Sequence, residues 1–512
     1  MSSSPDPAFE PAERLLYAGR WVALVRGQVI AQGATRQEAL LTARQFRPKD
    51  RLELQYMSEF PIQLPLLDRV RQTLPPGLPV YLVGGLVRDF LLGRMSHDLD
   101  FAVPSGALPL ARKLADALGG AYFPLDPSTD TARIVLKHPD GSRDILDFAG
   151  FRGDSLESDL RGRDFTLNAI AIDLHSGQMF DPLGGVADLR AKRLRACAET
   201  AFADDPLRIL RAVRQAAAFG FQIELQTRQW MKVAVPLLSK TSPERQRDEL
   251  FQMLAGPRPD ACILALDVLG ALSVVLPELS ALKGVTQSPP HVHDVWTHTL
   301  AVLRHLEGIL ATLAPQHDEN AANADLFNGL LALRLGRYRQ QLGEHLGFHL
   351  HPERSARALL FFAALYHDIE KPNTRTVEEN GRIRFLEHEE RGALTALKRG
   401  IALRLCNDEL DRLRLLIRHH MRFHFHAAQA EQGHKPTRKA IYRFFHDTGE
   451  AGVSLILLAL ADRRATYDHT LTQDQWAASL DVARAFLEAY YEQAEQVIHP
   501  PRLLTGDDLI NE

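Results

Sequence analysis

Two acidic residues near the start of this 512-residue chain have the spacing for metal chemistry. Asp98 and Asp100 flank one apolar residue, so a strand through them places both carboxylates on one face. Paired carboxylates repel unless a cation lies between them, and Mg²⁺ takes oxygen ligands. Two such ions can activate a hydroxyl and stabilise a leaving pyrophosphate. A third carboxylate on a neighbouring strand would complete the set; Asp147 is our candidate and Asp144 its rival.

A glycine pair precedes these carboxylates. Gly84 and Gly85 end the apolar run PVYLVGG and open a helical pattern. Backbone amides at such a turn can approach phosphate oxygens, because no side chain stands in the way. Arg88 follows on the helix and is a candidate triphosphate contact. Either motif alone usually marks a turn or a solvated pair, so it is the combination that predicts phosphate chemistry.

A second set of residues lies on apolar helical background in the other half of the chain: His298, His367, Asp368 and Asp462. Imidazoles and carboxylates from separate helices suit a divalent transition metal such as Ni²⁺, Mn²⁺ or Co²⁺. One buried histidine is usually part of the core, but an adjacent His-Asp pair is costly to bury unpaired. Of 21 histidines, 18 lie at or beyond His291, which favours a metal site in this half.

Composition excludes several classes of protein. With 45% hydrophobic and 24% charged residues, the chain is not mostly disordered, a coiled coil or a collagen-like fibre. No apolar run reaches bilayer length, and the N-terminus has no signal-peptide pattern, so we expect no membrane partner. Three scattered cysteines fit a reducing cytoplasm. The net charge of −4 does not exclude RNA, because residues 188–258 carry 13 basic and 8 acidic groups.

The hydrophobic patterns predict a multidomain α+β protein. Residues 1–60 read as a small α/β module without a catalytic constellation, and Thr35 is the expected N-cap of its helix. Residues 61–185 alternate strand and helix and include a hairpin with an Asp140-Gly141 turn. Residues 186–286 form a helical neck, 287–475 a second helical domain and 476–512 a helical tail.

Several motifs occur in an order that identifies a family: GGLVRDFLLG, HDLDF, DLRGRDFTLNAIA, DPLGGVADL, ADDPLRILRAVR and SPERQRDEL. The chain resembles the bacterial class II tRNA nucleotidyltransferase and poly(A) polymerase family, closely over roughly 62–285 and more loosely beyond. The resemblance implies a mixed α/β, polymerase-beta-like nucleotidyltransferase head. It also implies an all-helical neck and tRNA as the partner.

The resemblance implies roles for individual residues. Asp98 and Asp100 would be catalytic and hold Mg²⁺, and Asp147 would be the third acidic position. Arg163, Asp164 and Asn168 would contact the triphosphate and ribose. The family usually has Arg where this chain has Gly162, and Arg161 is the candidate replacement.

Selection of the base can be argued from hydrogen bonding. Cytosine and adenine each present an amino donor beside a ring-nitrogen acceptor, so a carboxylate and a guanidinium admit CTP and ATP and reject UTP and GTP. Asp205 and Arg208, three residues apart on a predicted helix, fit this task. The family's usual Glu is Asp204 here. Arg211, Arg214 and Arg245 are candidates for triphosphate or tRNA backbone.

Three activities are open on this scaffold: CC, CCA or A addition. The segment GFRGDSLESDLRGR is too short for the long loop that full CCA-adding members carry at this point, which favours CC addition. A separate enzyme would then add the terminal A from ATP. No Arg-rich poly(A) polymerase signature lies between Phe101 and Arg143.

The pattern H…HD…D resembles the HD phosphohydrolase superfamily, an all-helical metal fold. The resemblance implies His298, His367, Asp368 and Asp462 as ligands. The common HDIGKP reads HDIEKP here, with Glu370 in place of Gly and Lys371 as a candidate phosphate contact. His388, His419 and His420 match positions for a second metal or substrate.

Phosphatase or 2′,3′-cyclic phosphodiesterase activity follows as an expectation. The rivals are a degenerate HD fold that only binds tRNA, an RNA-binding phosphohydrolase, and a pure RNA-binding protein.

Overall fold

The computed structural model describes residues 17, 20–57, 62, 64–94, 98–139, 141–316 and 325–498. The extreme N-terminus, Asp140 of the expected hairpin turn and the last residues of the tail lie outside this part of the chain. The rest divides into two compact units, Met1–Arg208 with Gly220–Trp230 and Ile209–Phe219 with Met231–Glu512.

The N-terminal module has the expected order of elements. They are β1 (Trp21–Val25), β2 (Gln28–Gly33), α2 (Arg36–Phe46) and β3 (Glu53–Tyr56). β1 is the central strand and pairs antiparallel with both others. Thr35 Oγ1 accepts the Glu38 amide at 3.2 Å, and the Glu38 carboxylate accepts the Ala34 amide at 2.9 Å. Two backbone donors at the helix start are thus satisfied locally, which confirms the expected cap.

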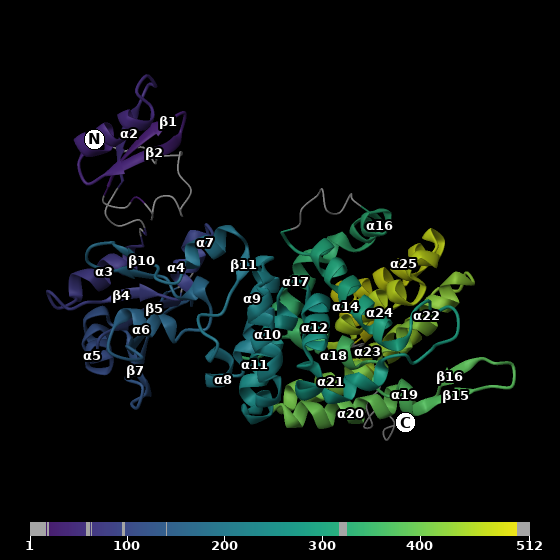
Figure 1. The fold of residues 1–512 in the computed structure, drawn as a ribbon. Helices are drawn as coiled ribbons and strands as arrows, with labels where there is room; N and C mark the ends of the chain where they lie inside the picture. Colours follow the sequence, from purple (N-terminus) through teal and green to yellow (C-terminus); the bar gives the residue numbers. More distant parts are fainter. Residues whose placement is uncertain are drawn as a thin grey trace, which may run out of the picture. The chain divides into compact units, whose positions relative to one another are not determined.

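The head follows in the same unit as strands interleaved with helices (Figure 1). The strands and helices are α3 (Pro65–Thr73), β4 (Tyr81–Val83), α4 (Gly85–Leu91), β5 (Asp98–Val103), α5 (Ala107–Leu118), β6 (Ala121–Asp126), β7 (Thr131–Lys137), β8 (Arg143–Gly150), α6 (Leu156–Arg161), η1 (Thr166–Asn168), β9 (Ala171–Asp173), β10 (Met179–Phe180), α7 (Gly185–Arg190), β11 (Arg193–Leu194), α8 (Ala201–Asp204) and β12 (Gln222–Ile223). α10 (Leu225–Ala234) crosses the boundary between the units.

The head sheet is seven-stranded, in the order β10-β9-β4-β5-β8-β7-β6. β5 and β8 are parallel neighbours, whereas β7 and β8 form the expected antiparallel hairpin. The rings of Phe101 on β5 and Phe148 on β8 stack at 4.5 Å and are fully buried. This contact fixes the register of the two strands that carry the candidate carboxylates.

The second unit is helical apart from two short hairpins. Its helices are α9 (Arg208–Phe219), η2 (Val235–Lys240), α11 (Pro243–Ala255), α12 (Pro259–Leu269), α13 (Leu272–Val275), η3 (Pro277–Leu282), α14 (Val295–Thr312), α16 (Leu326–Leu335), η4 (Gly336–Tyr338), α17 (Arg339–Gly347), α18 (Ala356–Tyr366), α19 (Lys371–Thr374), α20 (His388–Ala402), α21 (Asn407–His419), α22 (Arg422–Glu431), α23 (Arg438–Thr448), α24 (Ala451–Tyr467), η5 (Asp468–Thr470), α25 (Gln473–Tyr491) and η6 (Ala494–Ile498). The hairpins are β13 (His349–His351) with β14 (Arg354–Ser355), and β15 (Arg375–Val377) with β16 (Ile383–Phe385).

The core of this unit is formed by α14, α18 and α24, which pack against one another (Figure 1). α18 has no exposed residue, and α24 is buried along nearly all of its length. Helices apolar on all sides must be covered by other helices. Polar side chains on them are therefore held in water-poor surroundings.

No single helix among the described residues meets the length and hydropathy expected for crossing a membrane. The helices Arg438–Thr448 and Ala451–Thr470 meet these criteria only when they are taken together, and the pair is bent by 107° at its break.

A buried ion pair ties β14 to the start of α21. Arg354 donates to both carboxylate oxygens of Glu409, at 2.6 and 2.9 Å, and both side chains are nearly inaccessible. Burial raises the pKa of Glu409, but the hydrogen bonds from Arg354 outweigh it and the net pKa is lowered. The pair is therefore ionised in the folded chain.

We expect Glu409→Gln to lower the free energy of unfolding by about 3–5 kcal/mol, because it leaves a buried guanidinium uncompensated. Glu387→Gln, at an exposed pair with Arg391, should cost less than about 1 kcal/mol. The difference between the two variants should shrink as pH falls below the unfolded carboxyl pKa of about 4.3, because Glu409 contributes only while ionised. Urea unfolding measures the free energy of unfolding of each variant. Equal losses of that free energy in the two variants would contradict the role of the buried pair.

Candidate functional site

The two predicted carboxylates project from the first half of β5, the central strand of the head sheet. Asp98 and Asp100 are two residues apart and share one face, and Leu99 is buried on the other. Asp100 lies directly beside Asp147 in the parallel register of β5 and β8. Neighbouring strands are about 4.8 Å apart, so the strand pairing brings the third carboxylate to the first two.

The rivalry between Asp147 and Asp144 is resolved by strand alternation. Asp144 is an odd number of residues from Asp147 and projects from the opposite face of β8. Its carboxylate lies 2.7 Å from His138 Nε2. Of the two candidates, only Asp147 shares a face with Asp100.

The glycine pair lies against Asp100. Gly84 has φ +72°, and a Cβ there would lie 2.7 Å from Asp100 Oδ2, so any other residue would push the carboxylate away. The Gly85 amide donates a hydrogen bond to this carboxylate. α4 thus starts with its amides toward the acidic cluster.

Burial and the neighbouring charge of Asp147 raise the pKa of Asp100. Arg163 and the Gly85 amide act in the opposite sense but do not outweigh them. A bound Mg²⁺ would supply the missing positive charge, and the all-oxygen donor set fits that ion.

Asp147 is held by Arg133 on β7, which the sequence reading did not identify. The Arg133 guanidinium donates two hydrogen bonds of 2.8 Å to the two carboxylate oxygens. The two residues are direct partners in the antiparallel register. No motif marks Arg133 in the sequence, so only strand pairing reveals the contact.

Three of the residues expected to contact triphosphate and ribose are joined by hydrogen bonds, and the fourth, Arg163, pairs with a neighbouring carboxylate. Arg88 donates to Asn168 Oδ1 at 2.8 Å, and Asn168 donates to Asp164 Oδ1 at 2.9 Å. Arg163 is paired with the buried Asp159 at 2.9 Å. The side chains that the motif RGRDFTLN predicts to act together therefore lie together in the head.

The position of Arg161 does not support it as a substitute for the family's missing arginine. Its guanidinium pairs with Glu157 one turn earlier on exposed α6. Arg152 is the cation that lies near Arg163 and Arg208; partial desolvation and then those two guanidiniums lower its pKa. No motif marked Arg152 in the sequence.

Asp205 and Arg208 do not lie on one helix, so that expectation is wrong. α8 ends at Asp204 and α9 begins at Arg208. Pro206 disfavours helical geometry at the residue before it, and Asp205 is extended with φ −144° and ψ 97°. The pair instead flanks a tight turn in which the Asp205 carboxylate accepts the Leu207 amide at 3.3 Å.

Arg208 bridges the turn to the triphosphate motif. Its guanidinium donates to the carbonyl oxygens of Gly162 at 2.9 Å, Ala201 at 3.2 Å and Arg163 at 3.3 Å. The base-reading candidates and the triphosphate candidates thus belong to one connected structure within the first unit.

Arg211 and Arg214 lie in the second unit, on α9. Both guanidiniums pair with the carboxylate of Glu249 on α11, at 3.1 and 2.7 Å. Each of these two arginines therefore has an acidic partner within the chain. The prediction that they contact triphosphate or tRNA backbone did not include this partner. Arg245 lies on the same helix α11.

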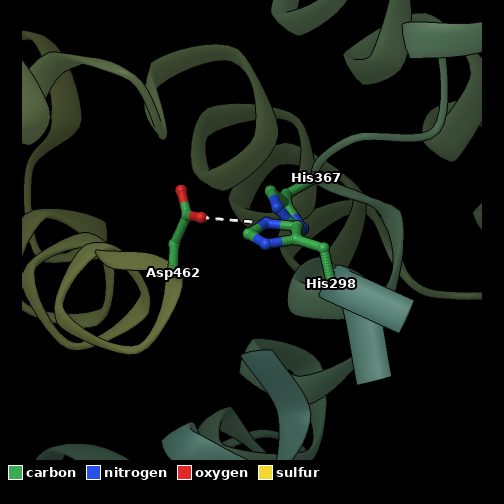
Figure 2. Close-up of side chains that lie close together, drawn as sticks. All are labelled: His298, His367 and Asp462. Carbon is green, nitrogen blue, oxygen red and sulfur yellow. Dashed lines mark ion pairs between the residues drawn. The ribbon is translucent and has the colours of Figure 1, made fainter. Parts of the chain in front are cut away.

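The second cluster is built on the buried helices of the second unit. Figure 2 shows His298 from α14, His367 from the end of α18 and Asp462 from α24 converging. Their ligand atoms lie within 4.8 Å of one another, and a second group, Asp368, His388 and His420, satisfies the same criterion. The four residues of the expected quartet lie together, because Asp368 Oδ2 is 3.2 Å from His367 Nε2 and 3.6 Å from His298 Nε2. Asp368 also joins the quartet to two histidines that were candidates for a second metal or substrate, His388 and His420.

Three histidines of this cluster share one hydrogen-bonding pattern. The Nδ1 atoms of His367, His388 and His420 each lie 2.7 Å from a backbone carbonyl oxygen. These carbonyls hold a proton on each Nδ1, so that each Nε2 is the atom that can bind a metal. This is the tautomer in which a neutral imidazole binds a metal. Burial lowers the pKa of His367, but the neighbouring Asp368 outweighs it and the net pKa is raised.

The Nε2 atoms face one another. Nε2 of His388 and Nε2 of His420 are 3.2 Å apart, and Nε2 of His367 is 3.2 Å from Asp368 Oδ2. The buried Nε2 of His367 forms no hydrogen bond among the described residues. Burial, followed by the neighbouring His388 and His367, lowers the pKa of His420 well below its usual value. A divalent cation between these atoms would remove the repulsion, so the donor set fits a transition metal.

The carboxylates are ionised despite their burial. Burial raises the pKa of Asp368, but His367 and Lys371 outweigh it and hold the net pKa well below its usual value. Lys371 Nζ lies 2.7 Å from Asp368 Oδ2 and donates to Gln287 Oε1 at 2.7 Å. Gln287, which precedes α14, therefore contributes to this cluster through Lys371. Glu370 accepts a hydrogen bond from Thr395 at 2.6 Å, so it is accommodated where the family has Gly.

Two further histidines belong here that sequence reasoning assigned no role. His424 Nε2 lies 2.7 Å from Asp462 Oδ2, and the ring of His291 lies 5.4 Å from that of His298. Burial, then the charge of Lys371, lowers the pKa of His291 to about 3. No sequence signal marked His424, because a break between α21 and α22 separates it from His420. His419 belongs to neither metal-binding group.

Comparisons with known proteins match three separate regions of the chain. A family profile described as "Poly A polymerase head domain" matches residues 80–195. One described as "Probable RNA and SrmB- binding site of polymerase A" matches 220–283, and one described as "HD domain" matches 329–467.

The relatives are nucleotidyltransferases. The chain is 34% identical to an A-adding tRNA nucleotidyltransferase of Deinococcus radiodurans, over 86% of this chain and 89% of that protein. It is 32% identical to a CC-adding tRNA nucleotidyltransferase of Thermus thermophilus, over 84% and 83%. A CC-adding enzyme of Geobacter sulfurreducens is 43% identical, over 39% of this chain and 46% of that protein.

Solved structures share the fold. The CCA-adding enzyme of Thermotoga maritima, complexed with tRNA, superposes with a TM-score of 0.53 at 20% identity, over 88% of this chain and 87% of that one. With a head, neck and HD region in this order and these relatives, the chain belongs to the tRNA nucleotidyltransferase and poly(A) polymerase family.

Proposed function

We propose that this chain adds nucleotides from nucleoside triphosphates to the 3′ end of tRNA without a template. The observation that carries the proposal is the juxtaposition of Asp98, Asp100 and Asp147 on one face of the sheet, against the amides of Gly84 and Gly85. Anionic ligands and phosphate-binding amides occur together where a pyrophosphate must be held and released. The tRNA substrate is that of the related enzymes.

Each part of the head has a role in this reaction. Asp98 and Asp100 would hold Mg²⁺, with Asp147 as the third acid; the bound metal would supply Lewis-acid activation of the tRNA 3′-hydroxyl and charge stabilisation of the leaving pyrophosphate. Arg88, Arg163, Asp164 and Asn168 orient the triphosphate and ribose. The hydrogen bonds that join Arg88, Asn168 and Asp164, and the ion pair of Arg163 with Asp159, position these groups before the substrate binds.

We further propose that the product is CC rather than CCA. Between β8 and Asp164 the chain forms only the capped helix α6, whose Ser155 and Ser158 close a capping box. These residues are too few to form the long flexible loop that full CCA-adding members carry at this point. Relatives named CC-adding support the proposal, and the A-adding relative keeps A addition as the alternative.

Product length separates these alternatives. Purified protein, given CTP and ATP and tRNA lacking its last three nucleotides, should extend it by two nucleotides and stop. Asp100→Asn should lower the rate by roughly 10³-fold or more, because one metal-holding carboxylate is lost. Extension by three nucleotides, or extension only of tRNA that already ends in CC, would contradict CC addition.

Base selection depends on Asp205, which we propose accepts a hydrogen bond from the amino group of cytosine. Asp205→Ala should reduce the preference for CTP over UTP by about 10- to 100-fold, as expected for one lost hydrogen bond to a charged group. Asp204→Ala is the matched control: its carboxylate contacts Thr200, at 3.1 Å, and the CTP:UTP ratio should change less than about twofold. A uniform loss with all nucleotides in the Asp205 variant would show that this residue does not read the base.

For the second unit we propose a metal-dependent phosphatase or 2′,3′-cyclic phosphodiesterase that repairs RNA ends before nucleotide addition. The observation that carries it is the set of buried Nε2 atoms aimed at one another and at Asp368. Lys371, buried beside Asp368, supplies a cation for a phosphate oxygen. The ligands are present in full, which argues against a degenerate fold that only binds tRNA.

Adjacent histidines provide a matched pair of variants. His420→Ala removes a residue of the second group and should lower Mn²⁺- or Ni²⁺-stimulated hydrolysis at least about tenfold. His419→Ala, next in the chain but outside both groups, should keep hydrolysis within about twofold. Nucleotide addition should persist in both variants; its loss together with hydrolysis in His420→Ala would argue for one site rather than two.

A further inference from the structure

A basic helix face in the second unit has no role in either proposed site. Residues 432–446 contain Lys435, Arg438, Lys439 and Arg443 and no acidic residue. All four cations are exposed. This is unusual for a chain with a net charge of −4.

These cations differ from their neighbours in having no acidic partner. On α20, α21 and α22, arginines pair with carboxylates, as Arg399 does with Glu278, Arg418 with Glu390 and Arg422 with Asp447. Within the part of the chain that the structure describes, Lys435, Arg438, Lys439 and Arg443 form no ion pair. Their charge is therefore available to an external anion.

α23 presents these residues on one face. Ile441, Phe444, Phe445 and Thr448 are buried and attach the helix to the core, where Phe444 meets Phe486 with ring centroids 5.0 Å apart. The outward positions include Lys439, Tyr442 and Arg443, at a spacing of three and four residues. Tyr442 is 37% exposed, so an aromatic ring lies among the cations.

The helix is also connected to the HD cluster. Asp447, near the end of α23, accepts a hydrogen bond of 2.7 Å from Arg422 at the start of α22. Two residues further along α22, His424 contacts Asp462, and two residues before Arg422, His420 belongs to the group with Asp368. The C-terminal end of the basic face is thus one hydrogen bond from the segment that contributes both histidines.

We propose that the outward face of α23 binds the ribose-phosphate backbone of RNA and makes RNA, rather than a free nucleotide, the substrate of the HD centre. Unpaired cations provide sequence-independent attraction to phosphates, and an exposed tyrosine gives a surface on which a base can stack. The assignment of a substrate rests on the hydrolase activity proposed above; the RNA contact does not. A membrane surface fits less well, because the apolar face of α23 is already covered by protein.

The test compares a single-stranded 12-nucleotide RNA that ends in a 2′,3′-cyclic phosphate with cytidine 2′,3′-cyclic phosphate. The full chain carries Lys439→Gln with Arg443→Gln; the control carries Arg304→Gln with Lys398→Gln, two exposed cations on α14 and α20. At low salt the test variant should lose roughly tenfold in kcat/KM on the RNA. Its logarithmic salt dependence should be flatter by about 1.4, for two lost contacts to a single strand. Hydrolysis of the mononucleotide should stay within about twofold, and the control should behave like the native chain.

Binding of the same RNA, measured by fluorescence anisotropy, tests the RNA contact separately from the hydrolase activity. If the native chain hydrolyses neither substrate, the hydrolase proposal fails, while weaker binding and a flatter salt dependence in the test variant would still support the RNA contact. Unchanged RNA binding would overturn the contact itself. An equal loss on RNA and mononucleotide would overturn it as well, since the variant would then have disturbed the metal centre. Loss of binding to anionic lipid vesicles, with RNA binding unchanged, would reassign the face to a membrane surface.

Discussion

Repulsion between groups that the fold forces together is the constraint on which both candidate sites depend. In the head, strand pairing sets Asp100 beside Asp147, and burial together with the charge of Asp147 raises the pKa of Asp100. In the second unit, packed helices set His388 Nε2 3.2 Å from His420 Nε2. Neither arrangement relaxes locally, because the backbone that carries it is buried and paired. Both arrangements are stabilised when a cation is bound, and this is the physical link between the fold and metal-dependent chemistry.

The two sites achieve this by different means. The head uses hard oxygen donors on neighbouring strands of the sheet, at a place that remains partly open to solvent, as a reaction with a large substrate and a leaving pyrophosphate requires. The HD cluster uses imidazoles whose Nδ1 protons are fixed by backbone carbonyls, in surroundings from which water is largely excluded. The chemistry of the donors therefore favours Mg²⁺ in the first site and a transition metal in the second. The division of the histidines between the halves of the sequence reflects this difference.

Sequence patterns predicted the parts of the fold that depend on local alternation. The DxD spacing gave the shared face of Asp98 and Asp100, and the apolar background of His298, His367 and Asp462 gave their burial. The choice between Asp147 and Asp144 needed the strand register. The geometry of Asp205 and Arg208 was mispredicted because Pro206 interrupts a helical pattern that otherwise continues. Arg133 and His424 were missed, because their contacts join segments whose pairing no spacing reveals. Arg211 and Arg214 were candidates for triphosphate or tRNA backbone, and only the ion pairs between α9 and α11 show their shared partner Glu249.

The metal content of the purified chain tests the central claim most directly. The account predicts that the full-length protein, dialysed against buffer with Mn²⁺ or Ni²⁺ and then against metal-free buffer, retains at least one transition-metal ion per chain by elemental analysis. His367→Ala with Asp368→Ala should abolish that retention while the far-UV circular dichroism is unchanged. A native chain that retains no metal would contradict the claim that the Nε2 atoms of the HD cluster are held together for a cation.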